Sequence, residues 1–193
     1  MPWTLPNILT WIRIAAIPLI VALFYVPEPW AYPAAGLLFA AAGITDSLDG
    51  YFARRLNQTS RLGAFLDPVA DKLIVAVALV LLVSRDTHTV LFGYDAHAVV
   101  VLAAVVIIGR EIAISALREW MAEIGARRKV AVSQLGKYKT ILQITGLSMM
   151  LYRLDIFGIP IYEAGVMLTI VAAALTLVSM VSYLRAAWPE LRQ

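Results

Sequence analysis

The chain of 193 residues is 61% hydrophobic, with a mean hydropathy of +0.80, which excludes an ordinary soluble domain. Its net charge of +3 invites a nucleic-acid interpretation. The basic residues are divided between apolar runs, however, so we expect no nucleic-acid partner. The absence of cysteine excludes a disulfide framework, a thiol nucleophile and a zinc-thiolate site. The composition therefore predicts an all-α integral membrane protein.

Six apolar runs are candidates for transmembrane helices, because a helix needs roughly 17 to 25 residues to cross a bilayer. The expected spans are, in chain order, Thr10–Tyr25, Ala34–Phe52, Gly63–Val83, Ala98–Leu117, Lys139–Leu151 and Tyr162–Leu184. The fifth is the shortest, so we expect it either to start near Ser133 with an amphipathic turn or to be tilted. No linker is long enough to divide the chain, which predicts a single domain over residues 1–193.

The distribution of Lys and Arg predicts the orientation of these spans, since cytoplasmic loops are enriched in both residues. The connections after the second and fourth runs are strongly basic, whereas the connections after the first, third and fifth runs carry mainly acidic charge. We therefore expect these two connections and both termini to face the cytoplasm. The first seven residues have neither a basic segment nor a small-residue cleavage site, so we also expect no cleaved signal peptide.

Four aspartates stand at the expected cytoplasmic ends of the second and third runs. On a helix, Asp46 and Asp49 are three residues apart, and Asp67 and Asp71 are four apart, so each pair projects from one face. Carboxylates at membrane depth are costly, and four that face one point repel each other unless cations lie between them. Oxygen ligands suit Mg²⁺, Mn²⁺ or Ca²⁺. The pattern predicts a site for two divalent cations.

These aspartates belong to a longer pattern, D-x-x-D-G-x-x-A-R, then eight residues, then G-x-x-x-D-x-x-x-D. Its fixed positions are Asp46, Asp49, Gly50, Ala53, Arg54, Gly63, Asp67 and Asp71. Eight specified residues at fixed spacing make a chance match very unlikely. The alternative is that the aspartates form ion pairs with nearby basic residues, but pairing does not require such a spacing. The basic residues in question are Arg54, Arg55, Arg61 and Lys72.

The small residues of the pattern leave room on the helix face for a diphosphate or a nucleobase, and Arg54 can bind phosphate oxygens with its guanidinium fork. The pattern resembles the signature of the CDP-alcohol phosphotransferases. That resemblance implies that Asp46, Asp49 and Asp67 bind Mg²⁺ or Mn²⁺ and that Asp71 is both a ligand and the general base. It also places Ser60 near the nucleotide of the donor, although Ser60 could equally be a helix N-cap.

A second group of residues is suited to an acceptor that carries its own phosphate. Arg110 and Arg118 lie eight residues apart in the fourth run, and Lys137 and Lys139 lie at the start of the fifth. Arg110 stands well inside an apolar run and needs an anion, which is Glu111, one of the aspartates or a phosphate-bearing ligand. The two lysines are also explained by the positive charge of cytoplasmic loops alone.

Segments outside the aspartate pattern resemble the members of this family that use sn-glycerol 3-phosphate as acceptor. They are Pro6–Arg13, Gly109–Trp120 and Gly136–Thr140. The resemblance implies transfer of the phosphatidyl group from CDP-diacylglycerol to sn-glycerol 3-phosphate, which gives phosphatidylglycerophosphate and CMP. It further implies a homodimer in the bacterial inner membrane, with its active site facing the cytoplasm.

By the same resemblance, Asn7 and Thr10 help to hold the nucleotide, with Arg13 as a further candidate, and the acceptor phosphate is held by Arg110, Arg118, Lys137 and Lys139. Other acceptors remain as alternatives, as in cardiolipin, phosphatidylinositol-phosphate or phosphatidylserine synthases of the same fold. A cation transporter also fits six spans with acidic residues, but its carboxylates are expected near the midplane and not at one side.

Overall fold

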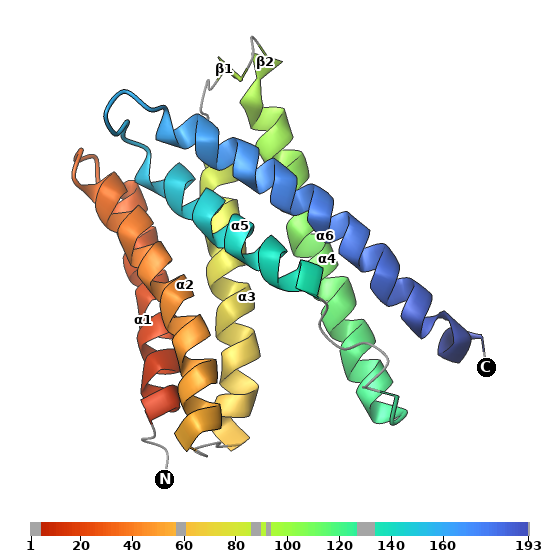
Figure 1. The fold of residues 1–193 in the computed structure, drawn as a ribbon. Coiled ribbons are helices and arrows are strands. Elements are labelled where there is room, and N and C mark those ends of the chain that lie inside the picture. Colours follow the sequence, from red (N-terminus) through yellow and green to blue (C-terminus); the bar gives the residue numbers. More distant parts are fainter. Residues whose placement is uncertain (1–4, 57–60, 86–89, 92–93, 127–133, 193) are drawn as a thin grey trace.

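The computed structural model describes residues 5–56, 61–85, 90–91, 94–126 and 134–192. It describes side chains at all of these positions except 5–6, 46–56, 61–62, 64, 90, 94, 134–135 and 137. Within these ranges the fold is a bundle of long helices with one very short antiparallel hairpin (Figure 1). The helices are α1 (Leu5–Tyr25), α2 (Ala31–Leu56), α3 (Arg61–Ser84), α4 (Ala96–Glu123), α5 (Gln134–Tyr152) and α6 (Ile161–Leu191).

Each of the six expected spans lies within one of these helices, so the helical interpretation of the apolar runs is confirmed. The helices extend further than hydropathy indicates: α4 continues to Glu123 and α6 to Leu191, and α5 starts at Gln134. The sequence did not predict the hairpin, in which β1 (Val90–Leu91) pairs with β2 (Tyr94–Asp95). Asp95 then caps α4 by accepting a hydrogen bond from the backbone N–H of His97, at 2.8 Å.

Three helices in the described part of the chain are long and apolar enough to cross a membrane. They are Asn7–Tyr25, Ala96–Glu123 and Ile161–Leu191, and a shorter apolar helical segment covers Ala31–Thr45. Many large apolar side chains point outward along the helices, for example Leu37, Val80 and Leu102, which are each about 60% exposed. A surface of this kind is stable in lipid and not in water. The chain is a membrane protein.

The core lies where all six helices meet, around Ile20, Phe39, Leu79, Ile107 and Leu147, which are almost fully buried. In Figure 1, α1 and α2 lie side by side at one edge, and α5 crosses from them towards α6 and α4. A smaller apolar cluster joins α4 to α6.

Two glycines bring α5 and α6 close together. A Cβ at Gly146 would lie 2.9 Å from the carbonyl oxygen of Gly165, and a Cβ at Gly165 would lie 2.8 Å from the carbonyl oxygen of Gly146. Small residues at such a crossing allow backbones in a membrane to approach closely. This contact fixes the position of α5, which forms one wall of the candidate site.

Candidate functional site

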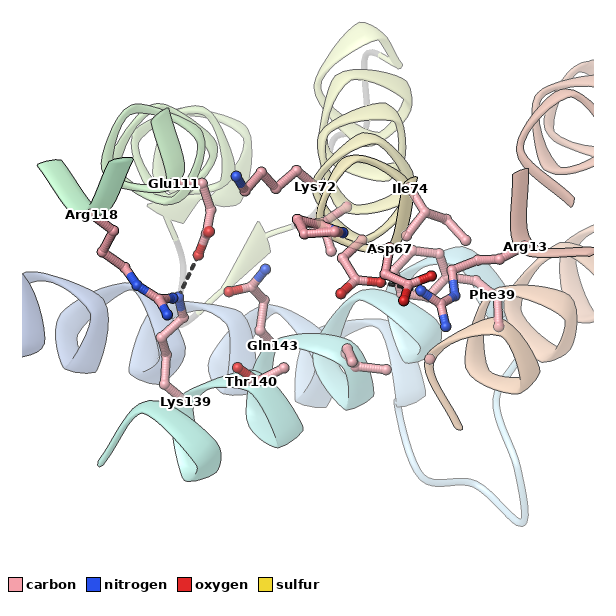
Figure 2. A pocket seen from close by; sticks show the side chains of 16 residues that line it. Arg13, Phe39, Asp67, Lys72, Ile74, Glu111, Arg118, Lys139, Thr140 and Gln143 are labelled. Atoms are coloured by element: carbon pink, nitrogen blue, oxygen red, sulfur yellow. Dashed lines mark hydrogen bonds and ion pairs between the residues drawn. The ribbon is translucent and has the colours of Figure 1, made fainter. Parts of the chain in front are cut away.

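Three large buried polar side chains, those of Arg13, Lys139 and Gln143, line one cavity of about 380 Å³ between α1, α2, α3, α4 and α5 (Figure 2). One end of the cavity is lined by Arg13, Asp67 and Asp71, and the other by Glu111, Arg118 and Lys139. Apolar and small residues from α2, including Phe39 and Gly43, complete the wall. The cavity therefore has an acidic end and a basic end within one space.

The acidic end is formed by contacts between α1 and α3. The hydroxyl of Thr10 donates a hydrogen bond to Asp67, and the guanidinium of Arg13 donates to Asp71 in an ion pair. Thr10 and Arg13 are three residues apart and their aspartates are four apart, so the two contacts lie one helical turn from each other. Arg13 is only 1% exposed, whereas the carboxylate of Asp71 is about 40% exposed towards the cavity.

Asn7 is a further polar residue on the same face of α1, one turn before Thr10, and it is buried. The three α1 side chains thus form a polar stripe on an otherwise apolar helix. Of these, the sequence assigned Asn7 and Thr10 to the nucleotide and left Arg13 as a weaker candidate. The structure brings Thr10 and Arg13 into direct contact with the aspartates, and the assignment of Asn7 and Thr10 to the nucleotide stays a prediction.

The first five residues of the aspartate pattern, from Asp46 to Arg54, follow along α2 beyond the wall of the cavity. Gly43 lines the cavity, and a Cβ there would lie 2.6 Å from the side chain of Ile144 on α5. Asp46 follows one turn later in α2. The side chains of Asp46, Asp49, Ala53 and Arg54 and the surroundings of Gly50 lie outside the described residues, as does Ser60 altogether.

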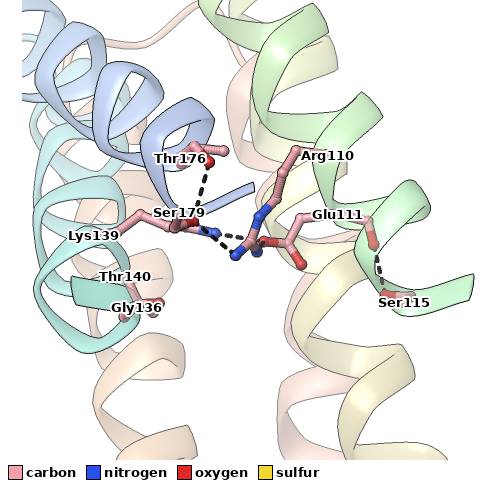
Figure 3. Close-up of polar contacts among 8 residues, drawn as sticks. All are labelled: Arg110, Glu111, Ser115, Gly136, Lys139, Thr140, Thr176 and Ser179. Atoms are coloured by element: carbon pink, nitrogen blue, oxygen red, sulfur yellow. Dashed lines mark hydrogen bonds and ion pairs between the residues drawn. The ribbon is translucent and has the colours of Figure 1, made fainter. Parts of the chain in front are cut away.

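The basic end is organised by one carboxylate, that of Glu111 (Figure 3). Its Oε1 accepts hydrogen bonds from Nη1 of Arg110 at 2.8 Å and from Nζ of Lys139 at 2.6 Å. Arg110 also donates through Nη2 to the hydroxyl of Ser179, at 3.1 Å, and its guanidinium lies over the ring of Tyr183. The anion that Arg110 requires is thus Glu111, one of the alternatives that the sequence left open.

Arg110 and Lys139 are both buried, so two cations share one carboxylate in a region of low polarity. Arg118 lies two turns beyond Arg110 on α4, and it is exposed to the cavity. A second, more open cavity continues from this end and is lined by Arg110, Arg118 and Lys139 together. Three of the four residues predicted to bind the acceptor phosphate therefore converge; the side chain of Lys137 lies outside the described residues.

The carboxylate oxygen atoms at the acidic end are suitable ligands for a divalent cation. Asp67 and Asp71 present oxygen atoms from one face of α3 to the same cavity, and carboxylate oxygens are preferred by Mg²⁺ and Mn²⁺. No group of three or more metal-binding side chains occurs among the described residues. The side chains of the other two expected ligands, Asp46 and Asp49, are not among them. Lys72, an alternative ion-pair partner, lines the cavity, but Asp71 pairs with Arg13.

The sequence did not predict the full role of one cavity residue, Glu111, or any role of another, Gln143. Glu111 was considered only as a partner of Arg110, and its second role as the partner of Lys139 depends on the packing of α4 against α5. Gln143 was not considered at all, although it lies four residues after Lys139 and therefore on the same face of α5. The signal that could have identified Gln143 was its position, one helical turn after Lys139 in an apolar run.

Comparisons with known proteins agree with this geometry. Residues 3–182 match the family model for CDP-alcohol phosphatidyltransferase. The chain is 48% identical over 191 residues to a protein of Escherichia coli strain K12, a match that covers 99% of this chain and 98% of the relative. Relatives from Shigella sonnei and Salmonella choleraesuis match with the same identity and coverage. All three are named CDP-diacylglycerol–glycerol-3-phosphate 3-phosphatidyltransferase. With a family match over most of its length and relatives of this similarity, the chain belongs to the CDP-alcohol phosphatidyltransferase family.

Proposed function

We propose that this protein transfers the phosphatidyl group of CDP-diacylglycerol to sn-glycerol 3-phosphate, which yields phosphatidylglycerophosphate and CMP. The observation that carries the proposal is the single cavity with aspartates at one end and buried or cavity-lining cations at the other. An acceptor with a hydroxyl at one end and a phosphate at the other matches that polarity. The names of the 48% identical relatives point to the same reaction.

In the proposed reaction the acceptor lies along the cavity with its phosphate towards Arg118 and Lys139. Its primary hydroxyl then lies beside Asp71, which accepts the proton as the hydroxyl oxygen bonds to the β-phosphorus of CDP-diacylglycerol. The bond between that phosphorus and the oxygen bridging to CMP breaks, and CMP leaves with the electron pair. Arg13 holds the carboxylate of Asp71 in position through its ion pair.

Two divalent cations, Mg²⁺ or Mn²⁺, are expected to be held by Asp46, Asp49, Asp67 and Asp71. When bound, they supply the charge neutralisation that a diphosphate requires at the reacting phosphorus. Thr10 supports Asp67 by its hydrogen bond, so the described α1 contacts keep both α3 carboxylates facing the cavity. Gly50, Ala53, Arg54 and Ser60, with Asn7, are proposed to accommodate the CDP-diacylglycerol head group.

The arrangement in the membrane is part of the same proposal. We infer one catalytic domain that crosses the bacterial inner membrane six times, with both termini and the cavity on the cytoplasmic side. The lipid donor then enters from the leaflet, and the water-soluble acceptor enters from the cytoplasm. A homodimer is proposed from the family resemblance alone.

The test is CMP release by the purified protein in detergent with CDP-diacylglycerol and Mg²⁺. Glycerol 3-phosphate is compared with serine, inositol phosphate and phosphatidylglycerol. Turnover with glycerol 3-phosphate alone supports the proposal, and turnover with a different acceptor alone contradicts it. In the same assay Asp71→Asn is expected to abolish CMP release while the variant stays folded and elutes like the wild type, with a lower unfolding temperature because Arg13 loses its ion pair. Substantial activity in this variant contradicts the role of Asp71 as base.

A further inference from the structure

Gln143 is a buried amide with a hydrogen-bonding atom that no described group satisfies. It projects from α5 into the cavity, it is only 4% exposed, and its Oε1 is buried without a hydrogen-bond partner among the described residues. Figure 2 shows its amide between Glu111 and Lys139 on one side and Asp67 on the other. An unsatisfied buried acceptor is costly, so such atoms are usually held for a water molecule or a ligand.

The position of Gln143 along the cavity is intermediate between the two ends. Lys139 lies one turn earlier on the same face of α5, about 6 Å along the helix axis. Asp67 and Asp71 line the far end of the same cavity. When a small acceptor reaches from the cations to the aspartates, its middle atoms therefore lie next to Gln143.

Glycerol 3-phosphate carries a hydroxyl at its middle carbon. With the phosphate at Lys139 and Arg118 and the primary hydroxyl at Asp71, the secondary hydroxyl is the one polar group of the acceptor that is left to pair with a residue between the two ends. A hydroxyl is a donor, and the Oε1 of Gln143 is an acceptor that lacks one. Of the other α5 residues that line the cavity, Ile144 has no polar side-chain atom, and Thr140 already uses its hydroxyl hydrogen to bond the carbonyl oxygen of Gly136, at 2.9 Å.

We propose that Gln143 is a specificity-determining residue, whose amide oxygen accepts a hydrogen bond from the secondary hydroxyl of the acceptor. The inference rests on the proposed function and deepens it, because it states which part of the acceptor is recognised by a neutral side chain. The phosphate and the primary hydroxyl are recognised by charged groups. Gln143 thereby separates glycerol 3-phosphate from phosphorylated alcohols of equal length that lack the middle hydroxyl.

The expected selectivity follows from the cost of leaving the amide oxygen without a partner. A site that is built to bind a hydroxyl rejects an analogue without it, because the buried polar atom then remains unsatisfied. For one neutral hydrogen bond we expect the wild-type kcat/KM to favour glycerol 3-phosphate by about 10- to 100-fold over 3-hydroxypropyl phosphate. The analogue differs only by loss of the secondary hydroxyl.

The experiment measures kcat/KM for CMP release with both acceptors, for the wild type, Gln143→Met and Ser148→Ala. Methionine keeps the length and volume of glutamine but removes the amide oxygen. Ser148 lies on the same helix, and its hydroxyl bonds to the carbonyl of Ile144 and not to the cavity. We expect Gln143→Met to lose activity on glycerol 3-phosphate and keep it on the analogue, so that the preference falls to within about threefold. Ser148→Ala keeps the wild-type preference.

The outcomes separate this inference from the proposed function. If the wild type releases no CMP with glycerol 3-phosphate, the proposed function fails. If it does so, but Gln143→Met retains the wild-type preference, the specificity role of Gln143 fails. Equal loss on both acceptors in a variant with the wild-type elution profile also overturns it. If turnover of the variant is too slow to measure, thermal stabilisation by each acceptor is compared, and an undiminished difference between the two acceptors again counts against the proposal.

Discussion

Replacing Glu111 with glutamine tests whether one carboxylate holds two buried cations in place. The side chain keeps its shape and one acceptor oxygen, but the negative charge that faces Arg110 and Lys139 is removed. Lys139 is 3% exposed and Arg110 8%, so both cations are poorly hydrated and depend on this carboxylate for charge compensation. Removal of one partner from a buried ion pair costs about 3–5 kcal/mol. Because the Glu111 side chain is 28% exposed, we expect the low end, about 3 kcal/mol.

The assay is equilibrium unfolding in detergent, with Glu123→Gln as the matched control. Glu123 is the exposed last residue of α4, so its neutralisation is expected to change the free energy of unfolding by less than about 0.5 kcal/mol. A second comparison uses Lys139→Met alone and together with Glu111→Gln. Since the double variant no longer carries the stranded ammonium group, its loss of stability should be smaller than the sum of the single losses by at least about 1 kcal/mol.

Two results refute this reasoning. One is a stability of Glu111→Gln equal to that of Glu123→Gln, which shows that the charge of Glu111 is not needed. The other is additivity of the Glu111 and Lys139 substitutions, which shows that the two side chains do not stabilise each other. Both readouts are independent of substrate, so they hold whatever the acceptor is.

Three further predictions concern the acceptor, the helix packing and the cations. Arg118→Ala is expected to raise the KM for glycerol 3-phosphate about 10- to 100-fold, because a charged contact is lost, and an equal rise in the KM for CDP-diacylglycerol contradicts this assignment. Gly146→Ala should cost about 1–3 kcal/mol of unfolding free energy, since its Cβ meets backbone of α6. Gly109→Ala, whose Cβ meets no described atom within 4 Å, should be neutral or slightly stabilising, and equal losses in both variants overturn the packing argument. Removal of divalent cations with a chelator should abolish CMP release, which Mg²⁺ should restore, and chelator-resistant turnover argues against the cation site.

The sequence predicted the helices well because each is marked by its own local apolar run. All six expected spans are helical, and the family assignment from the spacing of Asp46 to Asp71 is confirmed by the comparisons. Helix ends were less predictable, because polar turns such as those after Leu117 remain helical without a change in apolar content. The β1–β2 hairpin has only two residues in each strand, which is too short for any alternation to be visible.

The hydrogen-bond and ion-pair partners of side chains were harder to predict than the positions of the helices along the chain. The sequence offered three anions for Arg110, and only the packing of α4, α5 and α6 selects Glu111 and adds Ser179. It also suggested the neighbouring basic residues as partners for the aspartates, whereas the partner of Asp71 comes from α1, 58 residues earlier. Contacts between distant segments depend on how helices cross, and no spacing within a single helix encodes that.

The ion pair between Arg13 and Asp71 also has a consequence for how the protein is made. At a synthesis rate of 5–20 residues per second, Arg13 is added to the chain about 3 to 12 s before Asp71. During that interval α1 carries an arginine whose partner on α3 does not yet exist, and an arginine in an apolar helix costs up to about 3 kcal/mol in a bilayer. The contact between Arg13 and Asp71 therefore forms only after α3 has been made, so the amino-terminal helix completes its polar contacts together with the helix that carries the aspartates.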